Sequence, residues 1–216
     1  MITVTLADDH HIVRHGIKAL LEAEPDMRVI GEAGCGMEAS QMTQKAKPNV
    51  LVLDLMMPDI NGLKLISQIK KRSPDTAIVV LSMYGNDCYV LEALQAGAKA
   101  YVLKDSPQDE FVRAVREAAA GHRYLAPPLS DRAIEAYLLK TADTKLDPYD
   151  MLTFREREVL HLLIQGSTNV EISEHLCISR RTVEVHRARI MKKLGLHGRA
   201  ELIHYAILRG ILPESK

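Results

Sequence analysis

The stretch NVLVLDLMMPDINGL, residues 49–63, decides the fold. Within this stretch, an apolar run ends on a single carboxylate, Asp54. Removing an unpaired carboxylate from water costs a great deal of free energy. A buried strand that ends on such a group therefore needs partners for the charge. We expect neighbouring segments of the chain to bring those partners to Asp54.

Short β-rich runs alternate with segments of helical periodicity through the first half of the chain. The runs predict five strands, at 2–7, 28–33, 49–54, 77–82 and 99–104. The segments between and after them place apolar residues three or four positions apart, as in Leu63, Ile66 and Ile69 or in Ile12, Leu20 and Leu21. This spacing predicts helices. Their expected ranges are 11–23, 37–46, 61–72, 87–96 and 107–120. Five successive strand–helix units indicate an α/β fold with a five-stranded, doubly wound parallel sheet.

Polar residues stand at the carboxyl ends of four of the five predicted strands. They are Asp8 and Asp9, Asp54, Ser82 and Lys104. Because the carboxyl ends of parallel strands meet at one rim, three carboxylates, a hydroxyl and an ammonium converge there. Crowded carboxylates repel one another and need a cation, and an oxygen-only ligand set favours Mg²⁺ over zinc.

These strand ends carry a resemblance, since residues 1–121 resemble a response-regulator receiver domain with a flavodoxin-like fold. The resemblance implies that Asp54 accepts a phosphoryl group from a sensor histidine kinase, assisted by Lys104 and Ser82. It also implies a switch made by Ser82 and Tyr101, although a half-buried strand tyrosine is an equally good interpretation of Tyr101. The implied Mg²⁺ ligands are Asp8, Asp9, Asp54 and the backbone carbonyl of Met56.

Two further points bear on that resemblance. Phosphatases of the haloacid dehalogenase type carry the motif D-x-D after a buried strand, and their second aspartate acts as acid and base. Met56 stands at that second position here. A signalling switch is therefore favoured over an enzyme. Receivers often carry Lys-Pro with a cis bond after the fifth strand, whereas this chain has Lys104-Asp105, and the sequence leaves the isomer open.

Composition divides the 216 residues into two parts with opposite charge. Residues 1–150 contain 17 basic and 21 acidic side chains, and the remainder contain 11 and 7. A basic second half suggests that only this part meets a polyanion. Three scattered cysteines without CxxC spacing indicate neither a disulfide framework nor a zinc cluster. No signal pattern or membrane span is evident, so we expect a cytoplasmic protein without a membrane partner.

The second half predicts a small all-α domain behind a linker. We expect a receiver over 1–121, a linker with one helix near 130–140 over 122–150, and a four-helix domain over 151–216. Capping boxes at Thr153 and Thr168 each open a short helix. The second of these helices is joined by the turn 177–179 to a third helix, "RRTVEVHRARIMKKL", and this is a helix-turn-helix arrangement. A fourth helix is predicted near 199–208.

Helical periodicity gives the third helix an inner and an outer face. Val183, Ile190 and Leu194 form the inner stripe, and the outer stripe consists of Arg181, Glu184, Val185, Ala188 and Lys192. The helix is strongly basic, which suits phosphate contacts beside a DNA major groove. A basic, solvated helix without a ligand is the alternative.

Residues 152–212 closely resemble the LuxR-type DNA-binding domain, in "LTFREREVLHLLIQG" and "NVEISEHLCISRRTVEVHRARIMKKLGL". With the receiver, the whole chain resembles a transcriptional regulator of the NarL/FixJ class that binds double-stranded promoter DNA as a homodimer. The expected DNA-binding residues are Thr168, Arg180, Arg181, Thr182, Glu184, Val185, His186, Ala188, Arg189, Lys192 and Lys193, and those expected to pair the dimer are Leu202, Ala206 and Ile207. The alternative is a DNA-binding regulator that works without phosphorylation and uses its receiver only to dimerise.

Overall fold

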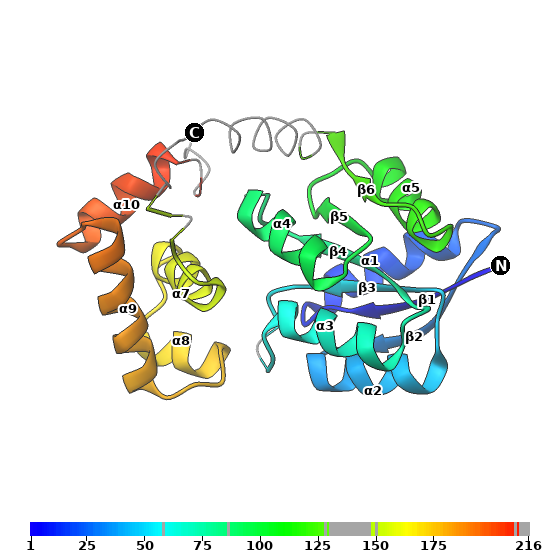
Figure 1. Ribbon diagram of the computed structural model, residues 1–216, viewed down its shortest axis with the longest axis horizontal. Coiled ribbons are helices and arrows are strands. Elements are labelled where there is room, and N and C mark those ends of the chain that lie inside the picture. The colour runs from blue at the N-terminus through cyan, green and yellow to red at the C-terminus, as the bar shows by residue number, and fades with distance from the viewer. Residues whose placement is uncertain are drawn as a thin grey trace. The chain divides into compact units, whose positions relative to one another are not determined.

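The computed structural model describes residues 1–57, 59–85, 87–127, 129, 148–149, 151–209 and 211 (Figure 1). The chain divides into two compact units, Met1–Asp143 and Thr144–Lys216, which we call the first and the second unit. The linker helix expected near 130–140 lies outside the described residues. Within the described part of the chain, no helix is both long and apolar enough to span a membrane.

A parallel sheet forms the centre of the first unit (Figure 1). Its strand order is β2-β1-β3-β4-β5-β6, and the strands are β1 Ile2–Ala7, β2 Met27–Ala33, β3 Val50–Asp54, β4 Ala77–Ser82, β5 Ala100–Leu103 and β6 Tyr124–Leu125. The α/β fold class is confirmed, and the structure adds β6 to the five predicted strands. Because β6 has only two residues, it shows no alternating pattern, and sequence periodicity therefore does not predict it.

Helices cover both faces of the sheet. They are α1 His11–Glu22, α2 Gly36–Ala46, α3 Gly62–Arg72, α4 Asp87–Ala96 and α5 Gln108–Ala119. Buried residues of α1 and α5 form one core with alternate strand residues such as Val52 and Val79. On the other face, α2 packs on α3 and α3 on α4. The central strands β3 and β4 are buried throughout, which explains their nearly continuous apolar sequences.

One residue of the predicted inner face of α1 lies on the opposite side. Ile12 is 86% exposed, whereas Leu21 is fully buried. Nine residues at 100° each place these two side chains on opposite faces of the helix, so Ile12 and Leu21 do not share a stripe. Leu20 packs at the edge of the core as expected.

The loop from β3 to α3 is held at two points. Both carboxylate oxygens of Asp59 accept bonds from the first amides of α2, at 2.7 Å from Gly36 N and 2.8 Å from Met37 N. At Gly62 a Cβ would lie 2.5 Å from Leu55 O, so the close approach of the backbone there requires glycine. These contacts fix the path of the chain directly after Asp54.

Helices form the described part of the second unit, around one apolar core. They are α7 Phe154–Ile164, α8 Asn169–His175, α9 Arg180–Leu194 and α10 Arg199–Leu208. Both predicted capping boxes are present, at Thr153 and Thr168. Gly195 ends α9 with φ of +68°, a left-handed conformation that favours glycine. The predicted four-helix domain with its helix-turn-helix is therefore confirmed.

Candidate functional site

An acidic pocket lies at the carboxyl ends of β1 and β3. Asp8 and Asp54 are each only 3% exposed. Lys104, which follows β5, places its Nζ 2.6 Å from Asp54 Oδ2 and 2.7 Å from Asp8 Oδ2. The other oxygen of Asp54 accepts a hydrogen bond from Met56 N at 3.0 Å. The partners that the sequence required for Asp54 are thus an ammonium and a backbone amide.

Burial and charge act on Asp54 in opposite directions. Burial raises the pKa of the Asp54 carboxyl above its ordinary value, while Lys104 and the Met56 amide work against that rise. Burial also disfavours the charged form of Lys104, but Asp54 and Asp8 outweigh it, so the pKa of the ammonium is raised. Lys104 therefore stays protonated and supplies a fixed positive charge beside the carboxylate.

The pocket also satisfies the donor requirements of a divalent cation. Ligand atoms of Asp8, Asp9, His10 and Asp54 all lie within 4.8 Å of one another. Three carboxylates against one ammonium leave an excess of negative charge, and oxygen-rich sets of this kind suit Mg²⁺. Sequence reasoning missed His10, whose Nδ1 lies 3.0 Å from Asp9 Oδ1. His10 directly follows the acidic pair Asp8 and Asp9, and this position was the signal that could have placed it in the pocket.

The two expected switch residues meet at the loop that follows β4. Ser82 is the last residue of β4 and is 1% exposed, and its Oγ accepts a bond from Tyr84 N at 3.2 Å. Tyr101 is fully buried, and its hydroxyl donates to Tyr84 O at 2.5 Å. Tyr101 thus points inward rather than lying half-buried on the strand. The peptide bond between Lys104 and Asp105, which the sequence left open, is trans.

A second group of candidate residues lies on α9. Its inner stripe of Val183, Ile190 and Leu194 is buried in the core, and every residue of the outer stripe is exposed, namely Arg181, Glu184, Val185, Ala188 and Lys192. Ser179 caps the helix, because its Oγ accepts from Thr182 N at 3.1 Å. The cap and the core contacts hold α9 with its basic side turned to solvent.

Other expected DNA-binding residues have contacts inside the second unit. Lys193 donates to Glu156 Oε2 at 2.7 Å and to Met151 O at 2.9 Å, so its ammonium is used in the fold. Thr168 accepts from Glu171 N as the cap of α8. His186 is partly buried, and that burial lowers the pKa of its imidazole. Arg180 and Arg189 are exposed.

Two of the three residues expected to pair a dimer are core residues instead. Leu202 is 4% exposed and Ala206 is fully buried, and both pack in the core of the second unit. They lie four residues apart, on the face of α10 that packs inward. Ile207 is 41% exposed and Leu208 is 72% exposed. Ile207 and Leu208 are therefore the exposed large apolar side chains of α10.

Comparison with known proteins decides the family. Residues 4–116 match the response regulator receiver domain, and residues 150–206 match the bacterial regulatory proteins of the luxR family. The chain belongs to the response regulators. The resemblance to the NarL/FixJ class is thereby confirmed, and this response regulator is a transcription factor with a receiver and a LuxR-type helix-turn-helix domain.

Relatives cover nearly the whole response regulator. The oxygen regulatory protein NreC of Staphylococcus carnosus is 38% identical over 213 residues, which is 97% of this chain and 98% of the relative. Among solved structures, RcsB of Salmonella enterica serovar Typhimurium bound to the promoter rprA matches at 28% identity with a TM-score of 0.64, covering 94% of this chain and 97% of RcsB. The response regulator ChrA of a heme-sensing system matches at 31% identity with a TM-score of 0.52, covering 98% of both chains.

Proposed function

We propose that this response regulator accepts a phosphoryl group on Asp54 from a sensor histidine kinase and then binds promoter DNA as a dimer. The observation that carries the proposal is the buried Asp54 carboxylate held 2.6 Å from the Lys104 ammonium. We also propose that the protein works in the cytoplasm, where promoter DNA and the catalytic part of a sensor kinase are found.

The chemistry follows from the groups around Asp54. An oxygen of the carboxylate attacks the phosphorus of a phosphohistidine, the P–N bond breaks, and the imidazole leaves with the bonding electron pair. No general base is needed, because the ionised carboxylate is itself the nucleophile. Lys104 would neutralise charge on the oxygens of the transferred group, and the Ser82 hydroxyl would donate a hydrogen bond to one of them.

Asp8, Asp9 and Asp54, with the Met56 carbonyl, would hold Mg²⁺ in this pocket. The bound ion would supply positive charge to the phosphoryl oxygens during transfer. Between them, the carboxylates carry more negative charge than Lys104 neutralises, and this excess is what favours a divalent cation. Asp8 is also paired with Lys104, so removal of Lys104 leaves two buried carboxylates in need of a counter-ion.

The exposed face of α9 is the proposed DNA-reading surface. Arg181, Val185 and Ala188 would face the major groove, with Arg180, Arg189 and Lys192 on flanking phosphates. The Glu184 carboxylate accepts hydrogen bonds and repels phosphate. It would therefore accept from a cytosine amino group or from Arg180, whose Nε lies 3.9 Å away. Thr182, His186 and Thr168 would support these contacts from the edge of the helix and from α8.

The central test is intact mass spectrometry after incubation with acetyl phosphate and Mg²⁺. The wild-type protein should gain one phosphoryl group, and Asp54→Ala should gain none. Asp75→Ala is the matched control, since Asp75 is an exposed aspartate outside the pocket, and it should still be modified. A phosphoryl group on Asp54→Ala would show that the assignment of the acceptor is wrong.

Binding to promoter DNA separates the two candidate roles of the receiver. In a phosphorylation switch, acetyl phosphate should tighten binding of the wild-type protein and leave Asp54→Ala unchanged. If the receiver serves only to dimerise, both proteins should bind equally tightly with and without acetyl phosphate. Fluorescence anisotropy of a labelled promoter fragment measures this difference.

A further inference from the structure

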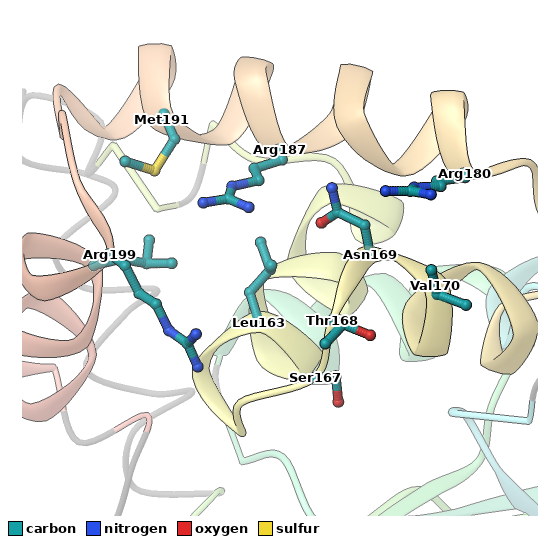
Figure 2. A pocket seen from close by; sticks show the side chains of 10 residues that line it. Leu163, Ser167, Thr168, Asn169, Val170, Arg180, Arg187, Met191 and Arg199 are labelled. Atoms are coloured by element: carbon teal, nitrogen blue, oxygen red, sulfur yellow. The ribbon is translucent and has the colours of Figure 1, made fainter.

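A pocket of about 290 Å³ lies within the second unit, between the start of α8, α9 and the start of α10 (Figure 2). Three of the residues that line it are arginines, Arg180 and Arg187 from α9 and Arg199 from α10. Figure 2 shows Arg180 and Arg187 on the helix that bounds one side, with Asn169 extending toward them from α8. The pocket is separate from the acidic pocket around Asp54, which belongs to the first unit.

The charge in this pocket is unbalanced. None of the lining residues is acidic. Arg187 and Arg199 form no ion pair among the described residues, and Arg180 reaches Glu184 only at 3.9 Å. Three guanidinium groups line this pocket and no carboxylate does, so the pocket favours an anion. Guanidinium groups are the side chains best suited to bind phosphate, because their donors match two oxygens at once.

Four of the other seven lining residues are apolar, and Ser167, Thr168 and Asn169 are polar. Leu163 and Leu202 are 8% and 4% exposed and form the inner wall with Met191, while Val170 is 43% exposed at the edge. A pocket with an apolar wall and a few converging polar groups is the usual form of a small-molecule site. A free phosphate ion would satisfy the arginines but would leave this wall in contact with water.

We propose that the pocket binds a small organic phosphate, with the phosphate at the arginines and the carbon portion against Leu163, Leu202 and Met191. Its effect on transcription rests on the proposed DNA-binding function, because Arg180 and Arg187 belong to α9. A ligand that neutralises these two residues removes positive charge that would otherwise meet the promoter. The ligand and the promoter therefore compete, and the pocket provides a second input beside phosphorylation.

The test of binding uses phenyl phosphate as the probe, with the full-length protein in Mg²⁺-free buffer, by isothermal titration calorimetry. The wild-type protein should bind the probe saturably, and at least threefold more tightly than inorganic phosphate. Arg187→Gln and Arg199→Gln should each weaken binding about tenfold, as expected for loss of a charge-assisted contact. Arg209→Gln, an exposed arginine outside the pocket, is the matched control and should bind as the wild type does.

Three results would overturn the proposal. They are the absence of saturable binding, equal affinity for phenyl phosphate and inorganic phosphate, and equal affinity in the wild type and in both pocket variants. Arg187 is exposed on α9, so its replacement should leave the domain folded even if that of Arg199 does not. Because these titrations contain no DNA, they are readable whether or not the proposed promoter binding is correct.

A second experiment distinguishes a free ligand from the DNA backbone as the source of the phosphate. Phenyl phosphate at ten times its dissociation constant should raise the dissociation constant for a promoter fragment about elevenfold if competition is complete. Arg187→Gln, which should bind the probe about tenfold more weakly, should show only about a twofold increase at the same probe concentration. If the pocket serves only a backbone phosphate, Arg187→Gln will weaken DNA binding while the wild-type protein shows no saturable binding of the probe, and the proposal fails.

Discussion

Glu158 and His161 lie one turn apart on α7 and are both buried, at 0% and 4% exposure. Burial raises the pKa of Glu158 to about 7, although Arg155 donates to its Oε2 at 2.9 Å. Burial lowers the pKa of His161 to about 3, and the nearby charge of Arg157 adds to the decrease. Each residue is therefore more easily held neutral in the folded protein than in the unfolded chain.

The two residues affect stability in opposite directions as pH changes. The stability that Glu158 contributes is fully present below its ordinary pKa of 4.5 and is lost as pH rises through about 7. The contribution of His161 is fully present above its ordinary pKa of 6.5 and is lost as pH falls toward 3. Between pH 4.5 and 6.5 the two dependences oppose each other, so their sum changes little in the wild-type protein.

Replacing Glu158 should remove its pH-dependent contribution to stability and leave that of His161. Glu158→Gln should match the wild type near pH 4.5 and exceed it at pH 8 by about 3 kcal/mol in free energy of unfolding, since one pKa unit corresponds to about 1.4 kcal/mol. Hydrogen exchange of the α7 amides, compared with the wild type at each pH, measures the difference. Glu174→Gln, an exposed carboxylate on α8, is the control. A difference that does not change with pH would contradict the prediction.

At the scale of elements, the start of α7 is tied to the last turn of α9. Glu156 closes the capping box of α7 and also accepts a bond from Lys193 at 2.7 Å. Burial disfavours the charged form of Glu156, but Lys193 and Thr153 outweigh it, so the pKa of the carboxyl is lowered. This contact makes Lys193 a structural residue, in contrast to its neighbour Lys192, which is exposed.

Variants of these two lysines should therefore behave differently. Lys193→Met should destabilise the second unit by about 1.5–3 kcal/mol, the cost of losing a bond to a buried charge, and leave the salt dependence of DNA binding unchanged. Lys192→Met should change stability by less than about 0.5 kcal/mol and reduce the logarithmic salt slope by about 0.9. Hydrogen exchange and anisotropy titrations between about 50 and 200 mM salt provide the two readouts. Equal losses of salt slope would show that Lys193 also reaches the DNA.

Elements with strong periodicity were predictable from the sequence, and residues that depend on tertiary contacts were not. The apolar runs and capping boxes located β1 to β5 and α7 to α9, because each signal is local. The acidic pocket was predictable because parallel strands bring their ends together whatever their side chains. The burial of Leu202 and Ala206 was not predictable, because α10 carries apolar residues on more than one side and its periodicity does not select the inner one. The contact of Lys193 with Glu156 depends on how α9 packs on α7, which the periodicity of α9 does not specify.

At the scale of the whole molecule, we expect promoter recognition to need two copies. One α9 covers only a few base pairs, which is too little to specify a site in a genome. A two-fold dimer reads an inverted repeat whose half-sites lie about one helical turn, roughly 10 bp, apart. The phosphorylated protein should therefore sediment on its promoter as two copies per site, and one copy would contradict the model of paired half-sites.

The exposed end of α10 should contribute to this pairing. Replacing Ile207 and Leu208 together by serine should weaken binding to an inverted repeat at least tenfold, because the apolar contact between the two copies is lost. Binding to a single half-site should be unaffected. Met37→Ser removes an apolar side chain that is 65% exposed in the first unit and serves as the control. Equal weakening on one and two half-sites would assign these residues to the fold or to DNA contact.

The two-residue strand β6 has a consequence for how copies of this protein associate. It follows β5 at one edge of the sheet, where it pairs Tyr124 with Ala100 and Leu125 with Tyr101. An edge this short offers another chain few backbone groups with which to continue the hydrogen-bonded ladder. At this edge, two copies held close together on a promoter would meet through side chains rather than by joining their sheets. The proposed association through this edge would then be reversible, so a signal that depends on it could end.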